Sequence, residues 1–424
     1  MKRIFFLTLF FVSQTIAAVF SSEEVEKLKH NFFANIQSNG AIIASPSKEE
    51  PNYYFDWIRD SAIAMCLIET WYESTHSQKL KDQLVHYVSW TQLIQHQNES
   101  LPRQDIMGEP KFYINGYPFE DSWVRPQNDG PALRATVLIH FAHQLLNQNE
   151  VEYVHNFLYN SSLDSSSMGV IKMDLEYTAH HWVDENFDLW EEVFGHHFFT
   201  TMAQQKALLE GATLARRLND KSAAVYYEKQ ADLMNTRLYQ HLDQNNYLIQ
   251  ATLPPHLGPQ KTFELDSSVI LAILLNPQSG ILAPSSIYVE KTVNALHDQF
   301  KQIFPINNNI SGPILFGRYP GDTYDGYQTS SIGNPWFTLT ATLAEYYFTL
   351  AENLPIDEQS LMLQYIHIGD AYLKLIKHYA PEMNLSEQIN LNTGIQQGAS
   401  SLTWSYVSVL RALEVREKLA QMKK

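Results

Sequence analysis

Hydrophobic residues recur at helical spacing along most of the chain from residue 23 onward. In the segment 195–218, for example, alanine, leucine and glycine stand three and four positions apart, so that they would form one buried stripe on a helix. The same periodicity predicts long helices at residues 23–36, 60–74, 78–96, 130–147, 195–218, 221–242, 287–303, 334–352, 359–379 and 400–418. Shorter helices are predicted at residues 150–159, 166–181 and 267–275.

Alternation typical of strands is scarce. Short runs at residues 111–115 and 247–251 could form hairpins at most. Loops rich in aromatic residues, glycine and proline lie between the helices, at residues 49–59, 101–129, 182–194, 305–333 and 380–399. No linker divides the chain, so we expect one domain spanning residues 19–424. Roughly a dozen helices that alternate with long loops favour a ring of helical hairpins, whose loops build one concave face.

Residues 1–18 have the layout of a secretory signal peptide. Lys2 and Arg3 precede a short apolar run, and a pair of alanines ends the segment at Ala18. We therefore expect cleavage after Ala18 and a secreted or periplasmic protein, with retention as a membrane anchor as the alternative. No later stretch has the pattern of a transmembrane helix, so we expect no contact with the membrane after cleavage.

Charge and cysteine content exclude several classes of function. Lys plus Arg is 30 and Asp plus Glu is 46, a net charge of −16, so nucleic acid is not an expected partner. The single cysteine, Cys66, excludes an intramolecular disulfide and cysteine-based zinc sites. The pairs His180-His181 and His196-His197 would point apart on a helix, and we interpret them as surface or site-rim residues. We expect no metal and no organic cofactor.

Five loop regions combine carboxylates, arginine and large aromatic residues. This mixture suits carbohydrate, because charged groups bind sugar hydroxyls and flat rings cover sugar C–H faces. The regions are NYYFDWIRD (52–60), EDSWVRPQNDGPALRA (120–135), FDLWEEV (187–193), GRYPGDTYDG with GNPWF (317–326 and 333–337), and NLSEQIN with SLTWSY (384–390 and 401–406). Each also has an ordinary structural interpretation: Arg59 and Asp60 could be an ion pair at a helix N-terminus, and Trp190 a core residue.

Taken together, the motifs closely resemble the catalytic domain of the glucoamylases of glycoside hydrolase family 15, and the fungal and yeast type in particular. The resemblance covers about residues 23–420, and its most specific segments are GEPKFYINGYPFEDSWVRPQNDGPALRA and FDLWEEVFGHHFFTTMAQQKALLEGA. It implies an all-α (α/α)6 barrel of six inner and six outer helices, with the active site in a pocket at one end. We expect a monomer that acts on α-glucan oligosaccharides.

The family's reaction is hydrolysis of the terminal α-1,4-glucosidic bond at the non-reducing end of starch- or glycogen-type chains, which releases β-D-glucose with inversion. Inversion requires two carboxyl groups on opposite sides of the anomeric carbon, about 6.5–9.5 Å apart. The resemblance makes Glu191 the general acid and Glu387 the general base. Glu191 would need a raised pKa, which burial against Trp190 and the neighbouring carboxylates Asp188 and Glu192 could supply.

Residues that bind the sugar also carry over from the resemblance. Arg59 and Asp60 match a pair that binds the terminal glucose, Glu192 matches a substrate-binding carboxylate, and Arg318 matches an arginine that contacts the glucan. Polar contacts of the backbone or side chains near Leu189 and Glu192 fit the same pocket. The remaining positions match aromatic walls of the site: Tyr53, Trp123, Trp190, Trp336 and Trp404.

The sequence also departs from the family's pattern. Phe119 stands where the family often has tyrosine, and Gly321 where an acidic residue is common. The chain ends soon after the last predicted helix, so we expect no starch-binding domain and a preference for soluble oligosaccharides. The alternatives are a relative that hydrolyses trehalose or α-1,6-linked glucans, and a glycan-binding protein that has lost catalysis. Both catalytic carboxylates are present, which favours an enzyme.

Overall fold

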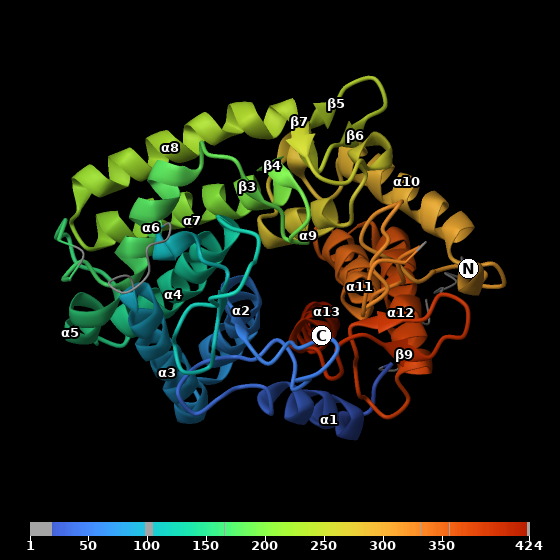
Figure 1. Ribbon diagram of the computed structural model, residues 1–424, viewed down its shortest axis with the longest axis horizontal. Helices are drawn as coiled ribbons and strands as arrows, with labels where there is room; N and C mark the ends of the chain where they lie inside the picture. Colours follow the sequence, from blue (N-terminus) through green and yellow to red (C-terminus); the bar gives the residue numbers. More distant parts are fainter. Residues whose placement is uncertain (1–18, 98–104, 165, 331, 356, 422–424) are drawn as a thin grey trace, which may run out of the picture.

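The computed structural model describes residues 19–97, 105–164, 166–330, 332–355 and 357–421. The predicted signal peptide, residues 1–18, lies outside the described residues. Helices dominate the described part of the chain and surround a common centre, which Figure 1 shows along the shortest axis of the molecule.

Six helices form a closed inner ring in which each helix contacts the next. They are α2 (Ile58–Thr75), α4 (Asp129–Asn147), α7 (Phe198–Arg217), α9 (Ser268–Leu275), α11 (Phe337–Glu352) and α13 (Thr403–Gln421). The last helix, α13, packs against the first, α2, and closes the ring (Figure 1).

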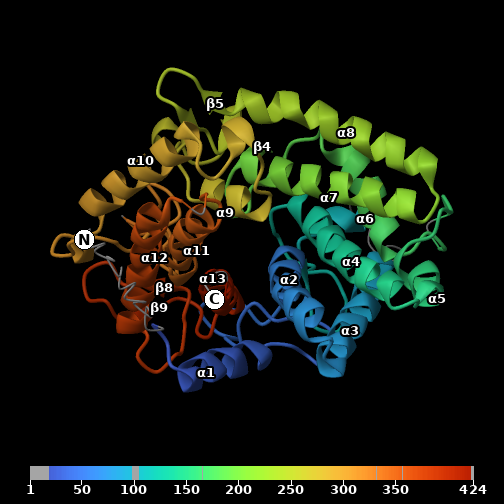
Figure 2. The ribbon, with the colours of Figure 1, turned by 180° about the vertical axis from the view of Figure 1, so that it is seen from behind.

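Outer helices cover this ring. Helix α1 packs on α13, α3 on α2, α6 on α4, α8 on α7 and α12 on α11, while α10 packs against strand β6. Their bounds are α1 (Ser22–Phe33), α3 (Gln78–Gln95), α6 (Val170–His181), α8 (Lys221–Gln240), α10 (Ile287–Ile303) and α12 (Gln359–Tyr379). The view from behind shows α1, α8 and α10 at the periphery (Figure 2). This is the predicted (α/α)6 barrel.

Residue pattern distinguishes the two rings. Inner helix α11 buries every residue from Phe337 to Tyr346, because it has neighbours on all sides. Outer helix α10 buries one face only, at spacings of three and four. Gly211 lies where α7 meets α6, and a Cβ there would stand 2.6 Å from the Leu175 side chain, so these two helices approach closely only with glycine.

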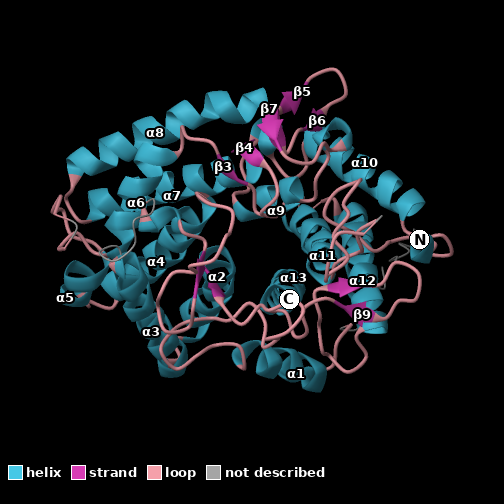
Figure 3. Ribbon diagram, viewed as in Figure 1, coloured by secondary structure: helices cyan, strands magenta, loops and turns pink. Residues whose placement is uncertain are grey.

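Short helical segments and strands occupy the connections. The segments are α5 (Val151–Tyr153), η2 (Ile106–Gly108), η3 (Val154–Leu158), η4 (Thr262–Glu264), η5 (Gly280–Leu282) and η6 (Pro305–Asn307). The strands are β1 (Asp56–Trp57), β2 (Lys111–Phe112), β3 (Asn186–Phe187), β4 (Phe194–His197), β5 (Leu242–Asp243), β6 (Leu248–Ile249), β7 (Thr252–Leu257), β8 (Gln388–Ile389) and β9 (Gln396–Gln397) (Figure 3). They pair antiparallel as β1-β2, β3-β4-β7, β5-β6 and β8-β9.

The structure contains both predicted hairpins, and one predicted helix begins later than expected. The run at 247–251 forms the predicted hairpin, β5-β6. The run at 111–115 also folds back as a hairpin, since Phe112 bridges to Pro118 and the Tyr113 N–H donates to the Tyr117 carbonyl at 2.8 Å, and β2 in addition pairs with the distant β1. The helix predicted at 195–218 begins only at Phe198, because β4 precedes it in a sheet that the sequence pattern did not reveal. His197, predicted at the surface or rim, is buried in that sheet, where its ring bonds the Asn186 carbonyl and the Thr252 hydroxyl.

Among the described residues, no single helix is long and apolar enough to cross a membrane. One pair of helical segments meets the length and composition criteria jointly, at residues 262–275 and 280–303, but it is bent by 118° between them.

Candidate active site

All the candidate site residues predicted from the sequence line one cavity of about 550 Å³. Each contributing loop leads into the N-terminus of an inner helix, which is why segments far apart in sequence meet at this end of the barrel. Helix N-termini carry partial positive charge and therefore favour carboxylates. The cavity is lined by Tyr53, Arg59, Asp60, Trp123, Leu189, Trp190, Glu191, Glu192, Arg318, Trp336, Glu387 and Trp404, together with Ala44, Pro51, Trp57, Ser122, Val124, Tyr324 and Leu402.

Glu191 stands in a tight turn before β4 with φ of 64°, a left-handed backbone that a residue other than glycine seldom adopts. Asp188 holds this turn. Its carboxylate accepts the N–H groups of Glu192 (2.8 Å) and Val193 (2.9 Å), and its carbonyl accepts the Glu191 N–H (2.9 Å). The strained conformation separates the two adjacent glutamate side chains, which bind different partners.

One carboxyl oxygen of Glu191 accepts three hydrogen bonds. The donors are the indole N–H groups of Trp57 (2.9 Å) and Trp123 (3.0 Å) and the side-chain amide of Gln127 (2.9 Å). Arg59 Nη2 lies 3.9 Å from the same oxygen. The sequence had suggested Trp190, Asp188 and Glu192 as the environment of this carboxyl group, but their side chains bind elsewhere, because the turn directs Glu191 toward the loops before α2 and α4.

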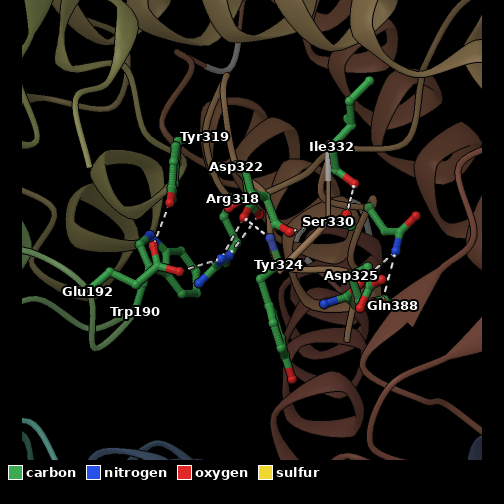
Figure 4. A network of polar contacts seen from close by, with 12 residues as sticks. Trp190, Glu192, Arg318, Tyr319, Asp322, Tyr324, Asp325, Ser330, Ile332 and Gln388 are labelled. Carbon is green, nitrogen blue, oxygen red and sulfur yellow. Dashed lines mark hydrogen bonds and ion pairs between the residues drawn. The ribbon is translucent and has the colours of Figure 1, made fainter. Parts of the chain in front are cut away.

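Glu192 points the other way, toward the loop before α11. Arg318 Nη2 donates to its carboxylate at 2.8 Å, and the Tyr319 hydroxyl donates to the other oxygen. Arg318 also binds Asp322 through Nε (2.8 Å) and Nη2 (Figure 4). Burial raises the pKa of Glu192, against the opposing charge of Arg318. The pair therefore presents fixed polar groups to the cavity.

Glu387 is 1% exposed and lies just before β8. The hydroxyls of Tyr53 (3.1 Å) and Tyr324 (3.4 Å) donate to its carboxylate, and so does the Ala399 N–H (3.4 Å). Burial raises the pKa of Glu387 to about 8, and these donors only partly oppose the shift. A Cβ on Gly398, which has φ of 75°, would stand 2.3 Å from the carboxylate, so only glycine leaves room for this arrangement.

Arg59 and Asp60 form the first turn of α2. Arg59 Nη1 donates to Asp129 (2.8 Å) and Gln127 (3.0 Å), and Arg59 Nε lies 3.9 Å from Asp60. Burial raises the pKa of Asp60 to about 6, against the opposing charge of Arg59. The two residues are thus an ion pair at a helix N-terminus and also part of the cavity wall.

Three tryptophans form a second wall. The Trp190 ring centroid lies 5.8 Å from that of Trp336 and 6.0 Å from that of Trp404, and its indole donates to buried Asp266 at 2.9 Å. The Arg318 guanidinium lies 5.6 Å from the Trp190 ring. All three tryptophans are 6–7% exposed, so they serve both the core and the cavity.

Several residues of the site were not among the predicted ones. Trp57 and Tyr324 stand inside motifs already quoted, so their aromatic character was a usable signal. Gln127 also stands inside a quoted motif, but its amide is not a distinctive residue type for a sugar site, and Asp266 lies outside all of the motifs and becomes important only through contacts made across the barrel. Gly321, where the family often has an acidic residue, has φ of 94°, a backbone that disfavours any side chain.

Comparison with known proteins identifies relatives of this chain. Residues 30–414 match the model of the family Glycosyl hydrolases family 15. A glucoamylase of Blastobotrys adeninivorans is 32% identical over 93% of this chain and 70% of its own length, and a probable glucoamylase of Schizosaccharomyces pombe is 31% identical over 90% of this chain and 85% of its own. Among solved structures, the glucoamylase from Saccharomycopsis fibuligera superposes with a TM-score of 0.83 at 27% identity, over 94% of this chain and 95% of that one.

Proposed function

The chain belongs to glycosyl hydrolases family 15, and we propose that it removes terminal glucose from the non-reducing ends of α-1,4-linked glucan chains with inversion. The observation that carries the proposal is the meeting of Glu191 and Glu387, which are far apart in sequence, in one cavity lined by ion pairs and tryptophans. A cavity of about 550 Å³ accommodates a few sugar rings, which suits the end of a chain. The glucoamylases among its relatives support the same substrate class.

In this mechanism Glu191 is the general acid. One of its oxygens is occupied by three N–H donors, which leaves the other oxygen to carry a proton and donate it to the glycosidic oxygen. Glu387 is the general base: it takes a proton from water as the water oxygen bonds to the anomeric carbon and the glycosidic bond breaks. Attack from the face opposite the leaving group gives β-glucose from an α-linkage.

The two carboxyl groups hold a single proton in the reactive form, and that proton is on Glu191. Burial favours the protonated form of Glu387, so this carboxyl group must lose its proton before it can act as the base. Because both groups line one cavity, the apparent pKa values from a pH–rate profile belong to the pair. The roles of the two carboxyl groups are therefore assigned by comparing variants on different substrates and by identifying the products, rather than from the pH–rate profile alone.

Substrate positioning follows from the fixed polar groups. Arg59 and Asp60 from one side, and the Glu192–Arg318 pair from the other, offer charged partners to sugar hydroxyls. The wall formed by Trp190, Trp336 and Trp404 offers flat surfaces to sugar C–H faces.

The test is proton NMR of the protein, residues 19–424, with maltotetraose, and with trehalose and isomaltose in parallel. We expect β-glucose to appear first from maltotetraose alone. Early α-glucose would contradict inversion, release from trehalose or isomaltose in preference would indicate a relative of different specificity, and binding without any glucose would indicate a silent glycan-binding protein.

Variants assign the two roles. Glu191→Gln should hydrolyse maltotetraose about 10²–10⁴-fold more slowly but keep most of its activity on α-D-glucosyl fluoride, whose leaving group needs little protonation. Glu387→Ala should lose both activities and regain a part with azide, which replaces the activated water and yields β-glucosyl azide. The reverse pattern would exchange the roles of Glu191 and Glu387.

We also propose export and a monomeric state. Export predicts a mature N-terminus at Val19, read by mass spectrometry of protein recovered outside the cytoplasm, and an intact N-terminus there would contradict cleavage. Light scattering tests the monomer, and a mass of twice that of the purified polypeptide or more would contradict it.

A further inference from the structure

A buried ammonium group lies directly behind the proposed general acid. Lys111, on β2, is 3% exposed, and its Nζ lies 4.2 Å from the ring centroid of Phe55, 4.5 Å from Trp57, 4.0 Å from Phe119 and 3.7 Å from Trp123. We call these four rings the aromatic cage. Lys111 itself does not line the cavity that holds Glu191.

Strand pairing builds the cage. In the β1-β2 pair Lys111 stands opposite Trp57, and the Phe119 N–H donates to the Lys111 carbonyl at 2.9 Å, which folds the loop after β2 back over the lysine. The rings contact one another edge to face: Phe55 with Phe119 at 5.3 Å, and Phe119 with Trp123 at 5.7 Å. A cation surrounded by π faces is attracted to each of them, most strongly where water is excluded.

Two rings of the cage reach the catalytic carboxyl. Trp57 and Trp123 each donate an indole N–H to the same oxygen of Glu191, at 2.9 and 3.0 Å. The ammonium lies over both indoles, 4.5 Å from the ring centroid of Trp57 and 3.7 Å from that of Trp123, and a cation over a π face attracts the ring electrons. The same lysine places a positive charge near Glu191.

Charged groups of both signs act on Lys111. Glu191, Asp121 and Glu109 contribute negative charge, and Arg125 contributes positive charge. Arg125 is paired with Glu109 at 2.7 Å, so these two largely offset each other. Burial lowers the pKa of Lys111 to about 8, and the lysine therefore stays charged at neutral and acid pH.

We propose that Lys111 is a positioning residue for the general acid: from inside the aromatic cage it aligns the two indoles that hold the Glu191 carboxyl and supplies the positive charge behind it. This inference rests on the proposed role of Glu191. It explains why a lysine, rather than an aliphatic residue, fills a pocket of four aromatic rings.

The test compares Lys111→Met, which keeps length and removes charge, with Lys111→Arg, which keeps charge, on maltotriose and α-D-glucosyl fluoride. For Lys111→Met we expect kcat on maltotriose to fall about 10–100-fold with KM within about twofold of wild type. The fall in kcat should be much smaller on α-D-glucosyl fluoride, because its leaving group needs little protonation by the general acid. The alkaline limb of kcat/KM should move to higher pH in Lys111→Met, since loss of a nearby cation favours the protonated form of the carboxyl pair, and should stay in place in Lys111→Arg.

Lys172→Met is the matched control. Lys172 is also buried and lies 5.4 Å from a tyrosine ring, but it is bound to Asp220 away from the cavity. It should lose thermal stability without any change in the alkaline limb or in the ratio of the two substrates.

Folded Lys111→Met with wild-type kcat and alkaline limb would overturn the proposal, and so would equal losses on both substrates. An inactive wild-type protein would instead overturn the proposed function. If Lys111→Met does not fold, Phe119→Leu carries the test: it removes one ring of the aromatic cage and leaves both indoles that donate to Glu191, and kcat on maltotriose should fall several-fold while activity on the fluoride is kept. Unchanged kcat in folded Phe119→Leu would then contradict the proposal.

Discussion

Replacing Glu387 with glutamine should stabilise the protein at pH 8 while removing the proposed base. The carboxyl group is 1% exposed, and burial raises its pKa from 4.5 to about 8. In the unfolded chain this group loses its proton near pH 4.5, whereas the folded protein keeps the proton up to about pH 8. Between these values the folded state binds more protons than the unfolded state, so its stability falls as pH rises.

The size of the effect follows from the shift. Each pH unit of that window costs about 1.4 kcal/mol, so the full shift amounts to at most ~5 kcal/mol of unfolding free energy. With an unfolding entropy of about 2 cal/mol/K per residue, a chain of this length would change its melting temperature by roughly 5 °C. Glutamine has nearly the same shape, and its carbonyl oxygen still accepts from Tyr53, so the variant keeps the packing and loses the pH dependence.

The assay is calorimetry of wild type and Glu387→Gln at pH 5, 6, 7 and 8. The difference in melting temperature should be small at pH 5 and should grow by several degrees in favour of the variant at pH 8. Glu382→Gln, at an exposed carboxylate paired with Lys27, serves as control and should show no such trend. A melting difference independent of pH would refute the reasoning.

Two further variants test the turns that hold the carboxyl groups. Gly398→Ala should abolish activity and destabilise the fold, because the added Cβ would stand 2.3 Å from the Glu387 carboxylate at a positive φ, and measurable turnover with a wild-type melting temperature would contradict this. Asp188→Asn weakens the cap of the Glu191 turn and should lower kcat about 10–100-fold with less effect on KM. Single-turnover kinetics on maltotriose measure the second effect, and a change in KM alone would refute it.

Local pattern was sufficient for the helices. Apolar spacing placed all of the inner and outer helices to within a few residues. A helix buried on one face has apolar residues three and four positions apart, and a helix buried on all sides is apolar throughout, so both are visible in the local sequence. Composition of the loops was also informative: carboxylates, arginine and tryptophan concentrated in five regions predicted a sugar site, the family resemblance selected residues within it, and those residues line one cavity.

Short strands were harder to predict. β1 and β2 are two residues each, and they pair across more than fifty positions. Strands this short show no alternation of apolar and polar residues from which they could be predicted. The four residues of β4 (Phe194–His197) are too short for a recognisable alternation and directly precede α7, and only pairing with β3 and β7 makes them a strand.

The sequence by itself determined which segments become helices and which loops line the cavity, and its family resemblance selected Glu191 and Glu387 as the candidate catalytic carboxyl groups. Only the tertiary structure decided how each group is held. The left-handed turn at Glu191, the indoles of Trp57 and Trp123 on its carboxyl, and Lys111 within the aromatic cage depend on six inner helices bringing their N-termini to one end. Such contacts join residues far apart in the chain, so they cannot be predicted from the local spacing of apolar and polar residues.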